Sequence, residues 1–163
     1  MVIWIIGKSG SGKTFFAKNL RKFLDNVTKV KWIDGDKFRA KYSRDLGYTL
    51  KDRKENSKRI QKYCRHNEIK GYLIICSILS IFNNHQKQNR NLFSKYIQIY
   101  IKSSLKTLRK RNNKNIYNLK KNVVGKDIKF PTPYKSDFVI KNEFDASLFV
   151  NIKKIADKIN AQI

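Results

Sequence analysis

Residues 7–14 carry the clearest chemical pattern in the sequence, because G-K-S-G-S-G-K-T matches G-x-x-x-x-G-K-[ST] at every fixed position. In such a loop the glycines let backbone N–H groups turn toward phosphate oxygens, and Lys13 reaches the β- and γ-phosphates. The pattern predicts an ATP site, with Thr14 as a ligand of Mg²⁺. The residues expected to contact ATP are Gly7, Ser9, Gly10, Ser11, Gly12, Lys13 and Thr14.

The phosphate loop alone does not identify the reaction, because kinases, GTPases, helicases and ATPases all share it. The residues that act on the acceptor are expected at Asp34 and Asp36. We expect an extended turn after a strand, with both carboxylates on the same side. One carboxylate, assigned as Asp34, can join Thr14 at the metal, and the other can accept a proton from an attacking hydroxyl. Which of the two is the base stays open, and a capped Asp-Gly turn is the structural alternative.

The elements that must position these residues follow an alternating strand and helix pattern. This pattern predicts an α/β fold, a P-loop NTPase three-layer sandwich, in which helices flank a parallel sheet of four or five strands. We expect a single P-loop kinase domain over residues 1–163. Strands are expected at 2–6, 30–33, 72–79, 96–101 and 138–140, and helices at 14–24, from a capping box at Thr49 to Ile69, and at 147–159.

Between residues 109 and 129 the sequence is rich in Lys, Asn and Arg and has few apolar anchors. Such a composition is typical of a lid or an exposed loop, and we expect it to close over the phosphates. Arg109 and Arg111 are expected to contact ATP from this segment. Closure would exclude water, which competes with the acceptor hydroxyl.

Composition narrows the function classes. The chain has 37 Lys and Arg against 12 Asp and Glu, a net charge of +25, which attracts polyanions, whether polyphosphates or nucleic acids. Its two cysteines make no disulfide framework, and the first apolar run is too short for a membrane span and lacks signal-peptide features. We therefore expect a cytoplasmic protein without a membrane partner. A nucleic-acid partner is not expected despite the charge, and a homodimer is left open.

A series of motifs after the phosphate loop resembles the adenylylsulfate kinase family over nearly the whole chain. Residues 33–39, I-D-G-D-K-F-R, are similar to the family's L-D-G-D-x-x-R, and residues 45–60 are similar to its D-L-G-F-S-x-x-D-R-x-E-N-x-R-R-I. Residues 77–80 resemble S-x-I-S, and Arg111, Lys114 and Tyr117 match the family's lid motif. The resemblance implies ATP and Mg²⁺ as cofactors and phosphorylation of the 3′-hydroxyl of a nucleotide. The acceptor residues it implies are Asp36, Arg39, Tyr48, Arg53, Asn56, Ile78, Leu79, Ser80, Lys114 and Val123.

Departures from the family pattern gather on the acceptor and lid side. Ile81 replaces a proline, Asn83 and Gln86 stand near two arginine positions, and Val123 aligns with a phenylalanine that stacks on the base. With Tyr48 as the one remaining aromatic wall, a large purine loses a stacking partner and a pyrimidine becomes conceivable. Our preferred refinement is therefore the branch of relatives that phosphorylates a cytidine diphosphate carrying a phosphoramidate, in bacterial capsule modification.

Three alternatives remain at this stage. The first is adenosine 5′-phosphosulfate as the acceptor, as in sulfate assimilation. The second, from another class, is a nucleic-acid-binding ATPase, which the charge favours but no further motif supports. The third is a kinase for a sugar or a shikimate-like acid, against which Arg53 and Asn56 argue because they suit a nucleotide.

Overall fold

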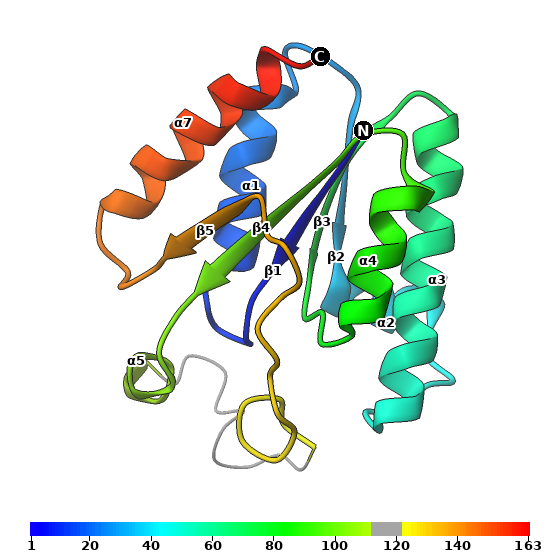
Figure 1. The fold of residues 1–163 in the computed structure, drawn as a ribbon, viewed down its shortest axis with the longest axis vertical. Coiled ribbons are helices and arrows are strands. Elements are labelled where there is room, and N and C mark those ends of the chain that lie inside the picture. Colours follow the sequence, from blue (N-terminus) through cyan, green and yellow to red (C-terminus); the bar gives the residue numbers. More distant parts are fainter. Residues whose placement is uncertain (112–121) are drawn as a thin grey trace.

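The protein folds around one five-stranded parallel sheet with helices on both faces (Figure 1), in a computed structural model that describes residues 1–111 and 122–163. The strands lie in the order β2-β3-β1-β4-β5. They are β1 (Val2–Ile6), β2 (Val30–Asp34), β3 (Leu73–Ile78), β4 (Tyr96–Lys102) and β5 (Phe138–Lys141). The helices are α1 (Lys13–Leu24), α2 (Gly35–Tyr42), α3 (Leu50–Ile69), α4 (Asn83–Leu92), α5 (Leu105–Arg111) and α7 (Ser147–Asn160).

Two apolar layers hold the helices to the sheet. Alternate side chains of β1 point to opposite faces, so that Ile3 and Ile5 pack with α1 and α7, while Val2, Trp4 and Ile6 pack with α2, α3 and Phe93, which follows α4. Each face is thereby covered, which explains why β1 is apolar at every position and β3 at every position except Ser77. The predicted three-layer α/β sandwich is confirmed.

All five strands run in the same direction, so their carboxyl ends meet at one edge of the sheet (Figure 1). β1 lies between β3 and β4, and the phosphate loop leaves its carboxyl end at the centre of this edge. Ligands of open α/β sheets bind at this edge. The capping box predicted at Thr49 is present. The Thr49 hydroxyl accepts from the backbone N–H of Asp52, and the Asp52 carboxylate accepts from the backbone N–H of Thr49.

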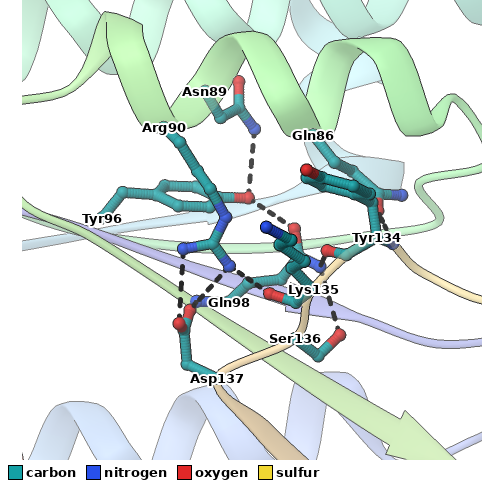
Figure 2. Close-up of polar contacts among 9 residues, drawn as sticks. All are labelled: Gln86, Asn89, Arg90, Tyr96, Gln98, Tyr134, Lys135, Ser136 and Asp137. Carbon is teal, nitrogen blue, oxygen red and sulfur yellow. Dashed lines mark hydrogen bonds and ion pairs between the residues drawn. The ribbon is translucent and has the colours of Figure 1, made fainter.

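Helices α2 and α4 are absent from the sequence-based prediction. The inward face of α4 consists of His85, Gln86 and Asn89, which are buried although polar, so no apolar period marks the helix. Figure 2 shows how α4 is attached: Asn89 donates to the Tyr96 hydroxyl on β4 at 3.2 Å, and the guanidinium of Arg90 forms two bonds with the carboxylate of Asp137.

Candidate active site

The phosphate loop owes its shape to glycines at two tight positions. Gly12 has φ +96°, and a Cβ there would lie 2.6 Å from the side-chain nitrogen of Asn142. A Cβ on Gly7 would lie 2.7 Å from the carbonyl oxygen of Ile101. Larger residues would therefore push the loop away from the strands that hold it. The Lys13 ammonium curls back over the loop and donates to the carbonyl of Lys8 at 2.7 Å.

Asp34 is the cap of a helix, which differs from the extended turn expected for residues 34–36. Its Oδ1 accepts from the backbone N–H groups of Asp36 and Lys37, at 3.1 and 3.3 Å, so the chain enters α2 at once. The capping bond favours the helix over the turn because it satisfies otherwise free N–H groups. The other oxygen, Oδ2, accepts from the Thr14 hydroxyl at 3.0 Å. The carboxylate thus connects the phosphate loop to α2.

One cavity of about 760 Å³ opens at the carboxyl edge of the sheet and collects most of the predicted site residues. It runs from the phosphate loop toward α2 and α3 on one side and toward α7 on the other. The predicted residues that line it are Ser9, Gly10, Gly12, Lys13, Thr14, Asp34, Asp36, Arg39, Tyr48, Arg53, Asn56, Ile78, Leu79 and Val123.

Four predicted residues do not line this cavity. Gly7 and Ser11 shape the loop from behind, and the carbonyl of Ser11 accepts from the Asn142 amide at 2.9 Å. Ser80 is buried and is hydrogen-bonded by Gln86, while Arg109 is exposed on α5, so the expected lid begins inside a helix. Lys114 and the side chain of Arg111 fall outside the described residues.

The side of the cavity beneath α2 and α3 is electropositive. The guanidinium groups of Arg39 and Arg53 lie 4.9 and 5.4 Å from the ring centre of Tyr48. Arg39 also donates to the carbonyl of Gly47 at 2.6 Å, and Arg53 to those of Tyr48 and Asn122, both at 3.0 Å. Burial, and then the charge of Arg39, lower the pKa of Arg53. Two partly desolvated cations side by side form a site that an anion would stabilise.

Val123 closes this side of the cavity from the segment that follows residue 121. Its side chain is buried, with only 5% exposed, and it packs with Leu108 in a small cluster that Leu105 and Phe144 complete. Its backbone N–H donates to the carboxylate of Asp127 at 2.9 Å, which fixes the turn. The lining of the cavity at position 123 is therefore aliphatic.

Sequence reasoning missed the wall of the cavity on the α7 side. Its residues come from the loop after β5 and from the starts of α1 and α7: Phe15, Asn142, Phe144, Asp145, Ala146, Leu148 and Phe149. Phe15, which the apolar pattern of residues 14–24 includes, and Phe149 are about half exposed, and no sequence motif marks either as a site residue. On the opposite side, Ser57 and Ile60 of α3 were also missed. The available signal was helical spacing, because Ser57 lies four residues after Arg53 and Ile60 lies four residues after Asn56.

The oxygen atoms present fit a magnesium ion. Thr14 and Asp34 supply a hydroxyl and a carboxylate that lie together at the phosphate loop, and Mg²⁺ in kinases commonly uses one or two such protein ligands and completes its shell with phosphates and water. Across residues 1–111 and 122–163 there is no cluster of three or more His, Cys, Asp or Glu side chains that could hold a metal alone.

Comparison with known proteins places the site in a family. Residues 1–141 match the family described as adenylylsulphate kinase. The chain is 28% identical over 170 residues to the adenylyl-sulfate kinase of Clostridium kluyveri, covering 100% of this chain and 85% of the relative. It is also 34% identical over 119 residues to the bifunctional enzyme NodQ of Rhizobium tropici, covering 71% of this chain but only 19% of that protein.

Solved structures give the same fold. The structure of the Mycobacterium tuberculosis APS kinase CysC, in complex with AMPPNP and APS, superposes with a TM-score of 0.86 at 22% identity, covering 96% of this chain and 95% of that one. No helix in residues 1–111 or 122–163 is both long and apolar enough to cross a membrane. With the family match spanning most of its length and the phosphate loop intact, the chain is an ATP-dependent P-loop kinase that belongs to the adenylylsulfate kinase family.

Proposed function

We propose that the protein transfers the γ-phosphoryl group of ATP to the 3′-hydroxyl of a small anionic nucleotide, and that the preferred acceptor is a cytidine diphosphate carrying a phosphoramidate, as used in the modification of capsular polysaccharide. The observation that carries the refinement is Val123, which stands in the cavity where the family has a stacking phenylalanine. The chain would act in the cytoplasm, where ATP is available.

ATP binds with its phosphates in the loop of residues 7–14 and its base toward the α7 side, where Phe144 and Phe149 supply apolar surface. Lys13 moves from the carbonyl of Lys8 to the transferring phosphoryl group and stabilises the charge that develops there. Thr14 and Asp34 hold Mg²⁺, which neutralises charge on the β- and γ-phosphates. Arg109, Arg111 and Lys114 approach from the lid in this proposal.

The acceptor lies between α2, α3 and the segment at Val123. Arg39 and Arg53 bind its phosphates, since each guanidinium presents a fork of donors and the pair is already crowded. Asp36, or Asp34, accepts the proton of the 3′-hydroxyl as that oxygen attacks phosphorus and the bond to ADP breaks. Tyr48 lies under the base, and Ile78 and Leu79 contribute from the end of β3, whereas the buried Ser80 supports them through its bond with Gln86.

The size of the base follows from the two walls. Tyr48 is exposed and can stack on a base, whereas Val123 offers no ring. Loss of one aromatic face costs about 1–3 kcal/mol of stacking, which corresponds to a roughly ten- to hundredfold weaker affinity. A purine has more ring surface to stack than a pyrimidine, so the aliphatic wall favours cytidine.

The test is a comparison of kcat/KM for the cytidine diphosphate-linked phosphoramidate and for adenosine 5′-phosphosulfate, at fixed labelled ATP and Mg²⁺. We expect the cytidine compound to be preferred, and Val123→Phe to shift the preference toward the adenosine compound by about tenfold or more. Lys13→Ala is the control, because it should abolish transfer of phosphate to either acceptor in a folded protein.

A preference of the unaltered protein for adenosine 5′-phosphosulfate by tenfold or more would replace the proposal with the sulfate-assimilation activity. Phosphate transfer to neither acceptor, together with salt-dependent capture of single-stranded nucleic acid on filters, would favour the nucleic-acid-binding ATPase instead.

A further inference from the structure

Four residues on one side of α3 line the cavity, and their side chains range from partly exposed, at the rim, to buried, at the floor. Arg53, Asn56, Ser57 and Ile60 follow one another at helical spacing, and all four line the cavity. Arg53 is partly exposed, whereas Asn56, Ser57 and Ile60 are 8%, 7% and 1% exposed. Charge is thus confined to the rim, and the deeper part of this wall offers a neutral amide and a hydroxyl above an apolar floor.

Ser57 has a buried partner on the neighbouring helix. Its hydroxyl lies 2.8 Å from Nδ1 of His85, which is 5% exposed on α4 and whose ring centre lies 5.3 Å from that of Phe82. Burial, and then the charges of Lys54 and Lys58 on α3, lower the pKa of His85. The imidazole is therefore neutral at pH 7, and its Nδ1 can accept a hydrogen bond.

Helix α4 holds this imidazole in a fixed place. Gln86 is fully buried: its amide nitrogen donates to the Ser80 hydroxyl at 3.3 Å, and its amide oxygen accepts from the Tyr134 backbone at 2.6 Å. Asn89 and Arg90 attach the next turn to β4 and to the segment before β5 (Figure 2). On the other flank, Gln61 of α3 donates to the side chain of Asn89 at 2.7 Å. The Ser57 and His85 pair lies in a rigid interface.

Asn56, the residue before Ser57, has a buried side-chain oxygen that can accept a hydrogen bond. Oδ1 of Asn56 is buried and has no hydrogen-bond partner among the residues that the structure describes. A buried acceptor without a donor is destabilising, so a ligand that brings an N–H group to this wall would relieve it. Sulfate oxygens cannot do so, because they only accept hydrogen bonds.

We propose that Ser57 is a specificity-determining residue that accepts a hydrogen bond from an N–H group of the acceptor, and that His85 is its positioning residue. The hydroxyl proton of Ser57 is directed to Nδ1 of His85, which leaves the lone pairs of the oxygen for the ligand. The inference rests on the proposed function, since it assigns the same cavity to a nucleotide acceptor. The N–H group is either the amino group of the base or the nitrogen of a terminal phosphoramidate.

The experiment measures the binding of three probes to the complex of the protein with ADP and Mg²⁺: cytidine diphosphate, uridine diphosphate and the cytidine diphosphate-linked phosphoramidate. Ser57→Ala should weaken binding about three- to tenfold, as expected for one neutral hydrogen bond. If the base amino group is recognised, both cytidine probes lose affinity and the uridine probe does not. If the phosphoramidate nitrogen is recognised, only the third probe loses affinity.

His85→Leu should reproduce the effect of Ser57→Ala, and the double variant should be no weaker than either, because both changes remove one coupled contact. His85→Asn, unlike His85→Leu, should keep the probe affinity of the unaltered protein, since the asparagine amide can place a polar atom where Nδ1 stands. The KM for ATP should stay unchanged in all of these. Arg65→Ala is the matched control: it removes the bond from Arg65 to Glu68 on α3, away from the cavity, and should lower the melting temperature while leaving probe affinity unchanged.

Equal affinity of Ser57→Ala and the unaltered protein for all three probes would overturn the inference and leave the proposed function standing. Additive effects of the two single changes would overturn the role of His85. Ser57→Ala decides the first point even if His85→Leu fails to fold. If the unaltered protein binds none of the probes and phosphorylates neither acceptor, the proposed function itself is wrong, and the inference falls with it.

Discussion

Replacing Asp34 separates two roles that one side chain combines. Its Oδ1 caps α2, and its Oδ2 faces Thr14 at the expected magnesium position. Asp34→Asn keeps an oxygen for the cap and loses the charge, whereas Asp34→Ala loses both. The alanine variant should therefore lower the free energy of unfolding by about 1 kcal/mol, and the asparagine variant by a few tenths at most. For a chain of this size, 1 kcal/mol corresponds to roughly 2–4 °C in melting temperature.

Catalysis should respond differently from stability. Both variants remove the negative charge that our proposal places next to the transferring phosphoryl group. The loss of one such preorganised group typically lowers kcat about 10²–10³-fold, or roughly 3–4 kcal/mol in barrier. We expect similar losses of kcat in the two variants at saturating ATP and acceptor. Asp36→Asn serves as a companion, because its side chain lines the cavity but does not cap α2.

The assay is transfer of labelled phosphate with thermal unfolding measured on the same samples. If Asp34→Asn keeps kcat within about threefold of the unaltered protein, the carboxylate is a cap and the assignment to magnesium or to the hydroxyl is wrong. If the loss of kcat follows the loss of stability across both variants, the apparent catalytic effect is structural.

Two further outcomes are expected. Gly12→Ala should lower the melting temperature by several degrees and abolish ATP binding, because φ +96° costs about 1–3 kcal/mol for alanine and its Cβ meets Asn142. Gly71→Ala is the control: with φ +82° and open space around it, this change should show the backbone cost alone. Equal effects of the two changes would refute the contact with Asn142. The lowered pKa of His85 means that the unfolded chain takes up its proton first, so stability should be complete above about pH 6.5 and should decline as the pH falls toward the folded pKa. His85→Asn should remove that part of the decline in equilibrium unfolding at several pH values, and an unchanged profile would contradict the assignment.

Local rules predicted the sheet and the phosphate loop well. Strands β1 and β3 are apolar at nearly every position, a pattern that is typical of strands covered on both faces. The eight-residue pattern of the phosphate loop requires a strand before it and a helix after it. The cap at Thr49 was likewise visible in the sequence, because both partners of the box lie within four residues.

The rest depended on contacts between residues far apart in sequence. Helix α4 buries amides and an imidazole, whose partners on α3, β4 and the segment before β5 cannot be read from its own ten residues. Asp34 was expected in a turn because Asp-Gly favours turns, but its carboxylate accepts bonds from the N–H groups of Asp36 and Lys37, and the chain enters α2. Apart from Phe15, the α7 wall of the cavity comes from residues more than 120 positions after the phosphate loop, where no spacing rule applies.

The amino ends of the strands, on the side of the sheet away from the cavity, are a suitable place to attach labels to this protein. The connections around residues 25–29, Gly71 and residues 93–95 join the amino ends of the strands, and both chain termini lie near that edge in Figure 1, away from the cavity. Gly71 itself is constrained by its φ of +82°, but the neighbouring Lys70 is exposed and can carry a label. Fluorescent dyes, affinity handles or surface attachment placed there would leave the cavity open, and a dye at this edge would report global unfolding without competing with nucleotides.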